Sequence, residues 1–415
     1  MAQKGSPEEA MIKEIEYVGR DCDCCGGARL EEILAYETKA RTRSRTYLWK
    51  VRNVVCRDCG FAFVSPVPTE GSLAEYYADC YSFWRGEAIE FSVENRLALL
   101  RRNIEPGSRP LFVEIGSNAT EPFQQALSQY VGEYRCAELN NDCASDFESL
   151  QSLAPGSVDI LSAYFVLEHV TNPGEFLAQA ARALKERGLL VVEVPNLYIY
   201  PINPAGIVWY EHTNHFSPRT LAAVAEGQGF ELVEVSYQDC SRPYGFAAVF
   251  AKTDGPRRGT GASADEAEYK IARACMTEGA NLIQNYYAQL REVRERIREA
   301  ARGGLPIVLW AANKYCVDLL DGMELPPSAV IVDSDPGKKD YLHPLPVRLP
   351  GEARDAIRRA GLFVINTSLH AGEILGQIRN EFGRELGDGE VVIIEPGFQI
   401  LKSASGRAET AAALS

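Results

Sequence analysis

LFVEIGS, residues 111–117, is an apolar run that ends in a glycine and a serine. A short apolar run bounded by turn residues predicts a buried β-strand. Helical and strand-type runs alternate along the residues that follow, which predicts parallel strands joined by helices. These runs are a helix at 121–131, a strand at 134–139, a strand at 158–163, a helix at 173–185 and a strand at 188–194.

A second region repeats this alternation nearer the end of the chain, with strand-type runs at 307–310, 329–332, 361–366 and 390–395. Between the two regions, Asp254–Asp265 (DGPRRGTGASAD) has no apolar periodicity and predicts a linker. From Glu266 to about Ala301, apolar residues recur every three or four positions, which predicts one long helix. The glycine pair at 303–304 is expected to end it.

The composition limits the possible functions. The chain has 415 residues and a formal net charge of −14, so we expect two or three domains and neither nucleic acid nor a membrane as a partner. No apolar run reaches the roughly 18 residues that span a bilayer, and residues 1–20 lack the apolar core of a secretory signal. We therefore expect a cytoplasmic protein, in which the 11 cysteines are thiols or metal ligands.

Four cysteines form two pairs with the spacing of a metal site. Cys22-x-x-Cys25 and Cys56-x-x-Cys59 are separated by 30 residues, and a glycine follows each pair. Four thiolates at this spacing predict a closed tetrahedral zinc site, which is structural because no ligand position is left open. Cys24 lies inside the first pair and is an alternative to Cys22 or Cys25 as a ligand.

A carboxylate follows the first strand at the spacing of a nucleoside site. Glu138 lies 22 residues after Gly116, at the expected carboxyl end of the second strand, where it can accept hydrogen bonds from ribose hydroxyls. SVDILSAYFVLEHVTNP (157–173) and EVPN (193–196) resemble the fourth and fifth strand regions of class I S-adenosylmethionine-dependent methyltransferases.

The order of motifs resembles one family, the zinc-containing sugar C-methyltransferases that act on nucleotide-linked 4-keto deoxysugars. The resemblance rests on the cysteine pairs, on GFAFVSPVPTEGSLAEYYADCY, VEIGSN, VLEHVTNP and WYEHTNHFSPRTL, on the long helix, and on VLWAANKY and VIVDSDP. It implies an α/β protein with a small N-terminal zinc-binding domain, a central doubly wound class I methyltransferase sheet and a C-terminal Rossmann-like domain. The predicted segments are an N-terminal tail (1–18), the zinc-binding domain (19–75), the methyltransferase domain (76–253), the linker and long helix (254–303), the Rossmann-like domain (304–402) and a disordered tail (403–415).

The resemblance also implies roles for individual residues. S-adenosylmethionine would be held by Glu114, Gly116, Ser117 and Glu138. Glu211 and His212 fall on the catalytic Glu-His pair of the family, while Tyr81 and Tyr76 would reach the sugar. The chain departs from the family where GSNDG is usual, since it has Gly116-Ser117-Asn118-Ala119-Thr120. It also has only about 19 residues between Glu138 and Val158, which is too few for the usual helix and third strand.

Methylation of carbon next to a ketone requires removal of a proton to form an enolate. Histidine is the side chain whose ordinary pKa suits that task, and WYEHTNHFS (209–217) contains two of the five histidines. We predict His212 as the base, with Glu211 orienting a histidine or binding a sugar hydroxyl. Trp209, Asn214 and His215 are candidates for lining the substrate pocket. Two alternatives remain open: a donor-independent isomerase or epimerase of keto sugars, and a catalytically silent methyltransferase-like protein.

Overall fold

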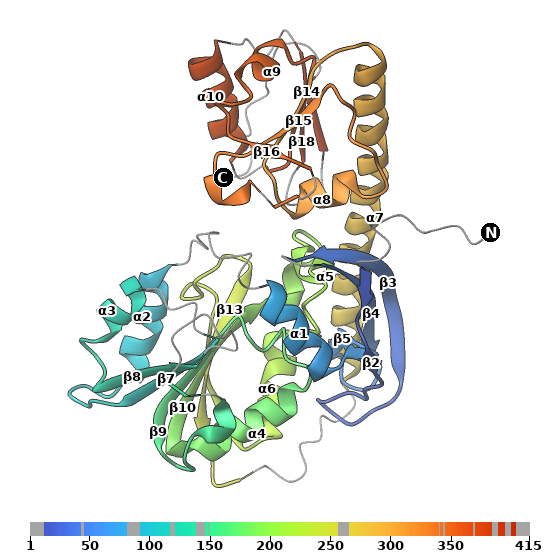
Figure 1. Ribbon diagram of the computed structural model, residues 1–415. Coiled ribbons are helices and arrows are strands. Elements are labelled where there is room, and N and C mark those ends of the chain that lie inside the picture. Colours follow the sequence, from blue (N-terminus) through green and yellow to red (C-terminus); the bar gives the residue numbers. More distant parts are fainter. Residues whose placement is uncertain are drawn as a thin grey trace. The chain divides into compact units, whose positions relative to one another are not determined.

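The structure is a computed structural model, which forms two compact units, Met1–Ala280 and Asn281–Ser415 (Figure 1). This division is coarser than the six segments expected from the sequence, whose boundaries stay predictions. The described residues are 12–42, 45–80, 92–116, 121–137, 146–147, 149–255, 265–339, 341–342, 345–367, 370–383, 389–394 and 400–403. Among them, no helix combines the length and the apolarity needed to cross a bilayer.

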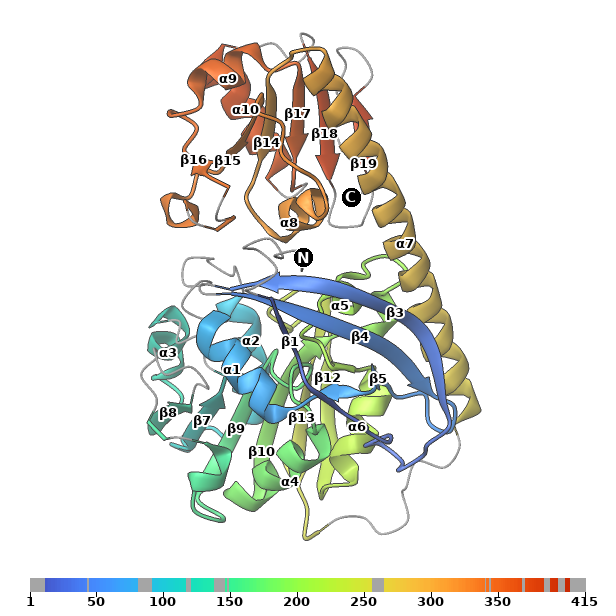
Figure 2. The same ribbon diagram turned by 45° about the vertical axis from the view of Figure 1, so that its right-hand side comes forward.

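The first unit begins with a sheet built on a long hairpin, β3 and β4, which is prominent in Figure 2. Strand β5 continues this sheet beside β4, and the two-residue strand β11, from far along the chain, pairs with β5. A separate small sheet pairs β2 with β6. The elements are β1 (Ile12–Glu14), β2 (Tyr17–Val18), β3 (Leu30–Arg41), β4 (Thr46–Cys56), β5 (Ala62–Val64), β6 (Val67–Pro68), α1 (Glu70–Cys80) and β11 (Asn214–His215).

A six-stranded sheet of order β12-β13-β10-β9-β7-β8 forms the rest of this unit. Strands β8, β7, β9 and β10 are parallel, whereas β13 runs antiparallel to both β10 and β12. Among the described residues between β8 and β9 there is no further strand, in agreement with the short spacing in the sequence. The strands are β7 (Leu111–Ile115), β8 (Glu133–Ala137), β9 (Val158–Tyr164), β10 (Leu184–Pro195), β12 (Phe230–Ser236) and β13 (Gly245–Lys252).

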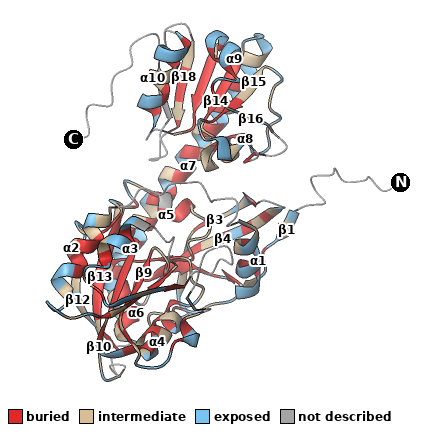
Figure 3. Cartoon of the chain, turned by 60° about the vertical axis from the view of Figure 1, so that its left-hand side comes forward, coloured by how far each residue is buried: buried red, intermediate tan, exposed pale blue. Residues whose placement is uncertain are grey.

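Helices cover both faces of this sheet, because its strands are apolar on both sides; β9, β10 and β13 are mostly buried (Figure 3). Residues of α2 and α3 pack on one face. Residues of α4 and α6 pack on the other face, together with Cys22, Cys56 and Cys59. The helices are α2 (Val93–Asn103), α3 (Glu121–Leu127), α4 (Pro173–Ala183), α5 (Ala205–Val208) and α6 (Pro218–Glu226), with 3₁₀ turns at Leu150–Ser152 and Leu197–Ile199.

Helix α7 (Glu266–Arg302) is the predicted long helix, and a turn at Gly303 and Gly304 follows it. The second unit has a sheet of order β16-β15-β14-β17-β18-β19, parallel except for β19. Helices α9 and α10 pack on one face. Its elements are β14 (Ile307–Trp310), α8 (Lys314–Leu320), β15 (Ala329–Val332), a 3₁₀ turn (Pro336–Lys338), β16 (Val347–Arg348), α9 (Arg354–Arg359), β17 (Leu362–Ile365), α10 (Ala371–Phe382), β18 (Glu390–Ile394) and β19 (Ile400–Ser403).

The predicted α/β class is confirmed in both units. Some predicted boundaries were wrong. The helix expected at 173–185 ends at Ala183, and β10 begins at Leu184 with an irregular pairing before Leu189. The helix expected at 121–131 ends at Leu127, because residues 128–130 turn back toward β8.

Candidate functional site

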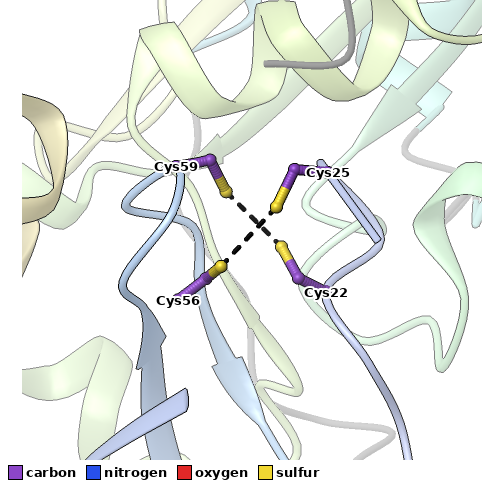
Figure 4. A group of neighbouring side chains, drawn as sticks. All are labelled: Cys22, Cys25, Cys56 and Cys59. Atoms are coloured by element: carbon purple, nitrogen blue, oxygen red, sulfur yellow. Dashed lines mark hydrogen bonds between the residues drawn. The ribbon is translucent and has the colours of Figure 1, made fainter. Parts of the chain in front are cut away.

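The four predicted metal ligands converge in the first unit (Figure 4). Cys22 and Cys25 lie in the turn before β3, while Cys56 ends β4 and Cys59 lies in the turn between β4 and β5. The Sγ atoms of Cys22 and Cys59 are 3.4 Å apart, and those of Cys25 and Cys56 are 3.6 Å apart. Sulfur atoms about 2.3 Å from one tetrahedral zinc ion would lie roughly 3.8 Å from one another, so the donor set fits zinc.

Backbone hydrogen bonds shape both cysteine turns. The Gly26 amide donates to the Cys22 carbonyl at 2.7 Å, and the Gly60 amide donates to the Cys56 carbonyl at 2.9 Å. Both glycines have positive φ, 71° and 78°, a conformation that side chains disfavour. At Gly60 a Cβ atom would also lie 2.7 Å from the backbone of Glu268. Glycine is therefore required at the second turn by space as well as by conformation.

Strand pairing connects the second cysteine turn to the loop that carries the predicted catalytic pair, Glu211 and His212. Strand β5 starts after Cys59 and pairs with β11, where Asn214 lies opposite Phe63 and His215 opposite Ala62. Arg20, beside the first turn, donates to Asn214 Oδ1 at 2.5 Å. The cysteine cluster and the loop at 209–217 are thus parts of one packed layer.

Asn214 and His215 were expected to line a substrate pocket, and this expectation needs correction. Both residues are 1% exposed and have their polar groups bonded within the protein. Asn214 Nδ2 donates to the carbonyls of Leu167 and Val170 at 2.8 and 2.7 Å. His215 Nε2–H donates to Asn53 Oδ1 at 2.7 Å, and its Nδ1 accepts from the Tyr200 hydroxyl at 3.0 Å. Neither residue has a free group for a substrate.

Glu211 is held by two aromatic residues, Tyr76 and Trp209. The Tyr76 hydroxyl donates to Glu211 Oε1 at 2.6 Å, and the Trp209 indole N–H donates to Oε2 at 3.0 Å. The Tyr210 hydroxyl lies 3.0 Å from that of Tyr76. Tyr76 is 0% exposed, so it supports the Glu211 carboxylate and, contrary to the sequence-based expectation, offers no surface to a sugar. Trp209 likewise binds Glu211 through its one N–H, although its ring is only half-buried.

His212 lies beside His169 and Glu168, which follow β9 in the VLEHV turn. The two imidazole rings have centroids 4.8 Å apart in an edge-to-face arrangement. The Nδ1 atom of His212 lies 3.1 Å from the Gly206 carbonyl, and a carbonyl can only accept, so Nδ1 carries the proton. In the neutral ring this leaves the Nε2 lone pair free to act as a base or as a metal ligand.

Burial controls the ionisation of this cluster. Burial, together with the neighbouring His169 and His215, lowers the pKa of His212 well below its ordinary value. It also lowers the pKa of His169 to about 4 and raises the pKa of Glu168 to about 8. Both imidazoles are therefore neutral near pH 7, where their nitrogen lone pairs are available.

Two of the four residues expected to hold the donor are described: Glu114 lies in β7, and Gly116 lies in the turn after it. Gly116 has a φ of 70°, and a Cβ atom there would lie 2.5 Å from Val166, so the turn packs closely against the VLEHV segment. Glu114 is 5% exposed and accepts from the Tyr134 hydroxyl at 2.8 Å, and burial raises its pKa. Ser117 and Glu138, also predicted to hold the donor, and Tyr81, predicted to reach the sugar, lie outside the described residues.

Three residues near the site were missed in the sequence analysis: Arg20, Glu168 and Arg242. The Arg242 guanidinium lies 4.4 Å from the Phe165 ring centre and donates to the Tyr244 hydroxyl at 2.6 Å. Glu168 could have been found, because it precedes His169 directly in the sequence. Arg20 and Arg242 carry no such signal, since only the fold brings them to these loops.

Residues 69–235 match the family model of a methyltransferase domain. This range includes the β7 turn, the VLEHV segment and the loop at 209–217. The protein is therefore a methyltransferase enzyme, with its methyltransferase domain in the first unit. No curated protein matches the chain.

Solved structures of methyltransferases resemble part of the chain. An S-adenosylmethionine-dependent methyltransferase from Archaeoglobus fulgidus is 20% identical, with 41% of this chain and 100% of that chain covered and a TM-score of 0.33. The 1,6-didemethyltoxoflavin-N1-methyltransferase from Burkholderia thailandensis, with bound 1,6-didemethyltoxoflavin and S-adenosylhomocysteine, is 13% identical, with 47% and 96% covered and a TM-score of 0.35.

Proposed function

We propose that this enzyme is an S-adenosylmethionine-dependent C-methyltransferase that methylates the carbon next to the ketone of a nucleotide-linked 4-keto deoxysugar. The methyltransferase domain supports the class of reaction. The observation that carries the choice of carbon is the His212 imidazole, whose Nδ1–H is bound to Gly206 and whose Nε2 lone pair stays available. Carbon methylation needs such a proton acceptor, because carbon becomes nucleophilic only as the enolate.

The donor would bind at the carboxyl ends of β7 and β8. Ligands of open α/β sheets bind at this edge, and the glycine at position 116 lets the turn after β7 pack closely against Val166. Glu114, Gly116 and Ser117 would line the site, and Glu138 would accept the ribose hydroxyls. When bound, S-adenosylmethionine supplies an electrophilic methyl group on a sulfonium ion.

His212 would accept the substrate proton at Nε2, while its Nδ1–H stays bound to Gly206. Its lowered pKa keeps the ring unprotonated before the reaction, but also makes it a weaker base. The negative charge of the adjacent enolate would offset this weakness by stabilising the imidazolium. Glu211, fixed by Tyr76 and Trp209, would accept a hydrogen bond from a sugar hydroxyl, and Tyr81 would also contact the sugar.

Zinc is the metal that the four-cysteine cluster would hold. Its sulfur atoms are close enough for one tetrahedral ion, and all four positions would be filled by protein. Cys24 is not a member of this cluster. The ion would therefore be structural, joining the turn before β3 to the turn after β4.

Hydrogen exchange tests the proposed chemistry. A panel of nucleotide-linked 4-keto deoxysugars is incubated with enzyme in deuterated water, with and without S-adenosylmethionine, and exchange at the carbon next to the ketone is followed by NMR. We expect the wild type to exchange and to methylate a member of the panel, and His212→Asn to lose both, because an amide nitrogen cannot accept the proton. His370→Asn, which changes an exposed histidine of the second unit, is the control.

The outcomes separate the proposed function from its alternatives. Exchange or epimerisation without consumption of the donor would favour an isomerase that uses the same base. Near wild-type methylation by His212→Asn would refute the enolate mechanism with this residue as base. Absence of binding of S-adenosylmethionine and S-adenosylhomocysteine in calorimetry would favour a silent methyltransferase-like protein.

A further inference from the structure

We propose that Glu168, His169 and His212 form a binding site for one divalent transition-metal cation, separate from the four-cysteine cluster. Each of the three residues offers one ligand atom, and these atoms all lie within 4.8 Å of one another. The Glu168 Oε1 to His169 Nε2 distance is 3.8 Å. Ligands about 2.1 Å from one ion lie roughly 3.0–3.5 Å apart, so a small contraction of the side chains would bring them into coordination.

The backbone brings these side chains together. The Glu168 carbonyl accepts from the amides of Thr213 and Asn214, at 2.7 and 3.1 Å, immediately after His212. The Asn214 side chain adds two hydrogen bonds to the carbonyls on either side of the Glu168–His169 pair. The VLEHV turn and the loop at 209–217 are therefore held in one relative position by hydrogen bonds that do not involve the Glu168 carboxyl group.

Unpartnered polar atoms in this cluster provide independent support. Glu168 is 1% exposed, and its Oε2 atom has no hydrogen-bond partner among the described residues; the same is true of His169 Nδ1. A buried carboxylate oxygen without a partner is unfavourable in a native protein and indicates a bound ion, water or ligand. The Arg242 guanidinium stacks on Phe165 and donates to Tyr244, while its Nε has no hydrogen-bond partner among the described residues. Its positive charge favours the ionised form of Glu168, although no described hydrogen bond joins the two side chains.

The ligand set indicates the class of cation. Two imidazoles and one carboxylate suit the divalent cations of the first transition row, from Mn²⁺ to Zn²⁺, and such three-residue sites leave coordination positions open. The Nδ1–H of His212, bound to the Gly206 carbonyl, directs Nε2 as the ligand atom, and a carbonyl of this kind commonly orients metal-binding histidines. The open positions would accept oxygen atoms, such as the hydroxyl and keto oxygens of a bound sugar.

This inference goes beyond the proposed function and does not rest on it. A cation on His212 Nε2 would occupy the lone pair that the enolate mechanism gives to the substrate proton. His212 can therefore act in one of these two ways at a time. Cation binding can be measured without substrate or donor, so it can fail or succeed independently of methyl transfer.

Manganese binding to the full chain tests the site. Mn²⁺ is titrated into the protein with its cysteine site as purified, and free Mn²⁺ is followed by electron paramagnetic resonance. Thiolates bind Mn²⁺ poorly, so the cysteine cluster should not interfere. We expect one bound Mn²⁺ per chain, and an affinity at least roughly tenfold lower in Glu168→Gln and in His169→Gln.

His370→Gln is the matched control, because His370 also lies beside a carboxylate, with its Nδ1 atom 3.3 Å from Glu373, but is exposed at the start of α10 in the second unit. It should bind Mn²⁺ as the wild type does. No bound Mn²⁺ at millimolar concentration, or unchanged affinity in both Glu168→Gln and His169→Gln, would overturn the proposal. Thermal melting and S-adenosylhomocysteine binding of each variant identify any that fails to fold, and donor binding without Mn²⁺ binding would refute only the cation site.

Discussion

Asn214→Ala should destabilise the first unit strongly, although it removes only a small polar side chain. The amide makes hydrogen bonds of 2.8 and 2.7 Å to the Leu167 and Val170 carbonyls, and its oxygen accepts from the Arg20 guanidinium at 2.5 Å. Asn214 is 1% exposed, so water cannot readily replace it. At roughly 1–3 kcal/mol for each buried group left unpaired, we expect a loss of about 3–5 kcal/mol in the free energy of unfolding.

Asn103→Ala is the matched control. Asn103 also donates through Nδ2 to the Leu99 carbonyl and to the Glu234 carboxylate. It is half-buried at the end of α2, where water can form hydrogen bonds to the groups that the substitution leaves unpaired. We expect it to cost less than about 1 kcal/mol. Melting followed by circular dichroism should show a Tm about 6–10 °C lower for Asn214→Ala, at roughly 2 °C per kcal/mol for a unit of this size. Equal shifts for the two variants would refute the assignment of Asn214 as the residue that joins the two loops.

Two further predictions concern the metal cluster and pH. Cys56→Ser should lose the one zinc per chain that elemental analysis is expected to find, and should unfold more easily, whereas Cys24→Ser should keep it; native protein without stoichiometric zinc would contradict this. Burial, followed by the charge of Arg20, lowers the pKa of His215 to about 3, so only the unfolded chain binds this proton between pH 3 and about 6.5. Stability should therefore fall as the pH drops below about 6.5, by about 2 kcal/mol at pH 5 for this histidine. Urea unfolding between pH 5 and 6.5 gives the number of protons taken up on unfolding from the slope of the unfolding free energy against pH. His215→Asn should lower that number by about one. An unchanged slope would show that His215 is protonated in the folded protein.

The sheets could be predicted from the sequence because their strands carry strong local signals. The apolar runs at Ile307–Trp310 and Ala329–Val332 end at turn residues and became β14 and β15 with the predicted bounds. The long helix was predicted to within one residue of its end, because periodic apolar positions stop at a glycine pair. The cysteine cluster was predicted for the same reason, since its ligands occur as two short local motifs.

The surroundings of the catalytic loop could not be predicted in this way. Strand β11 has only two residues, and its partner β5 lies about 150 residues earlier in the chain, so no local pattern indicates the pairing. Asn214 and His215 are polar, and polar residues in a loop are usually exposed. Their burial follows from partners that only the fold supplies, namely Asn53, Tyr200 and Arg20.

Neighbouring residues of the loop at 209–217 therefore have different roles. Asn214 and His215 use their polar groups to fix the backbone, while Glu211 and His212 keep a carboxylate and an imidazole lone pair beside the VLEHV turn. Moving the loop would leave several buried groups without partners, at roughly 1–3 kcal/mol each. Such a loop holds its imidazole in a defined position before any ligand binds, which both a proton acceptor and a metal ligand require.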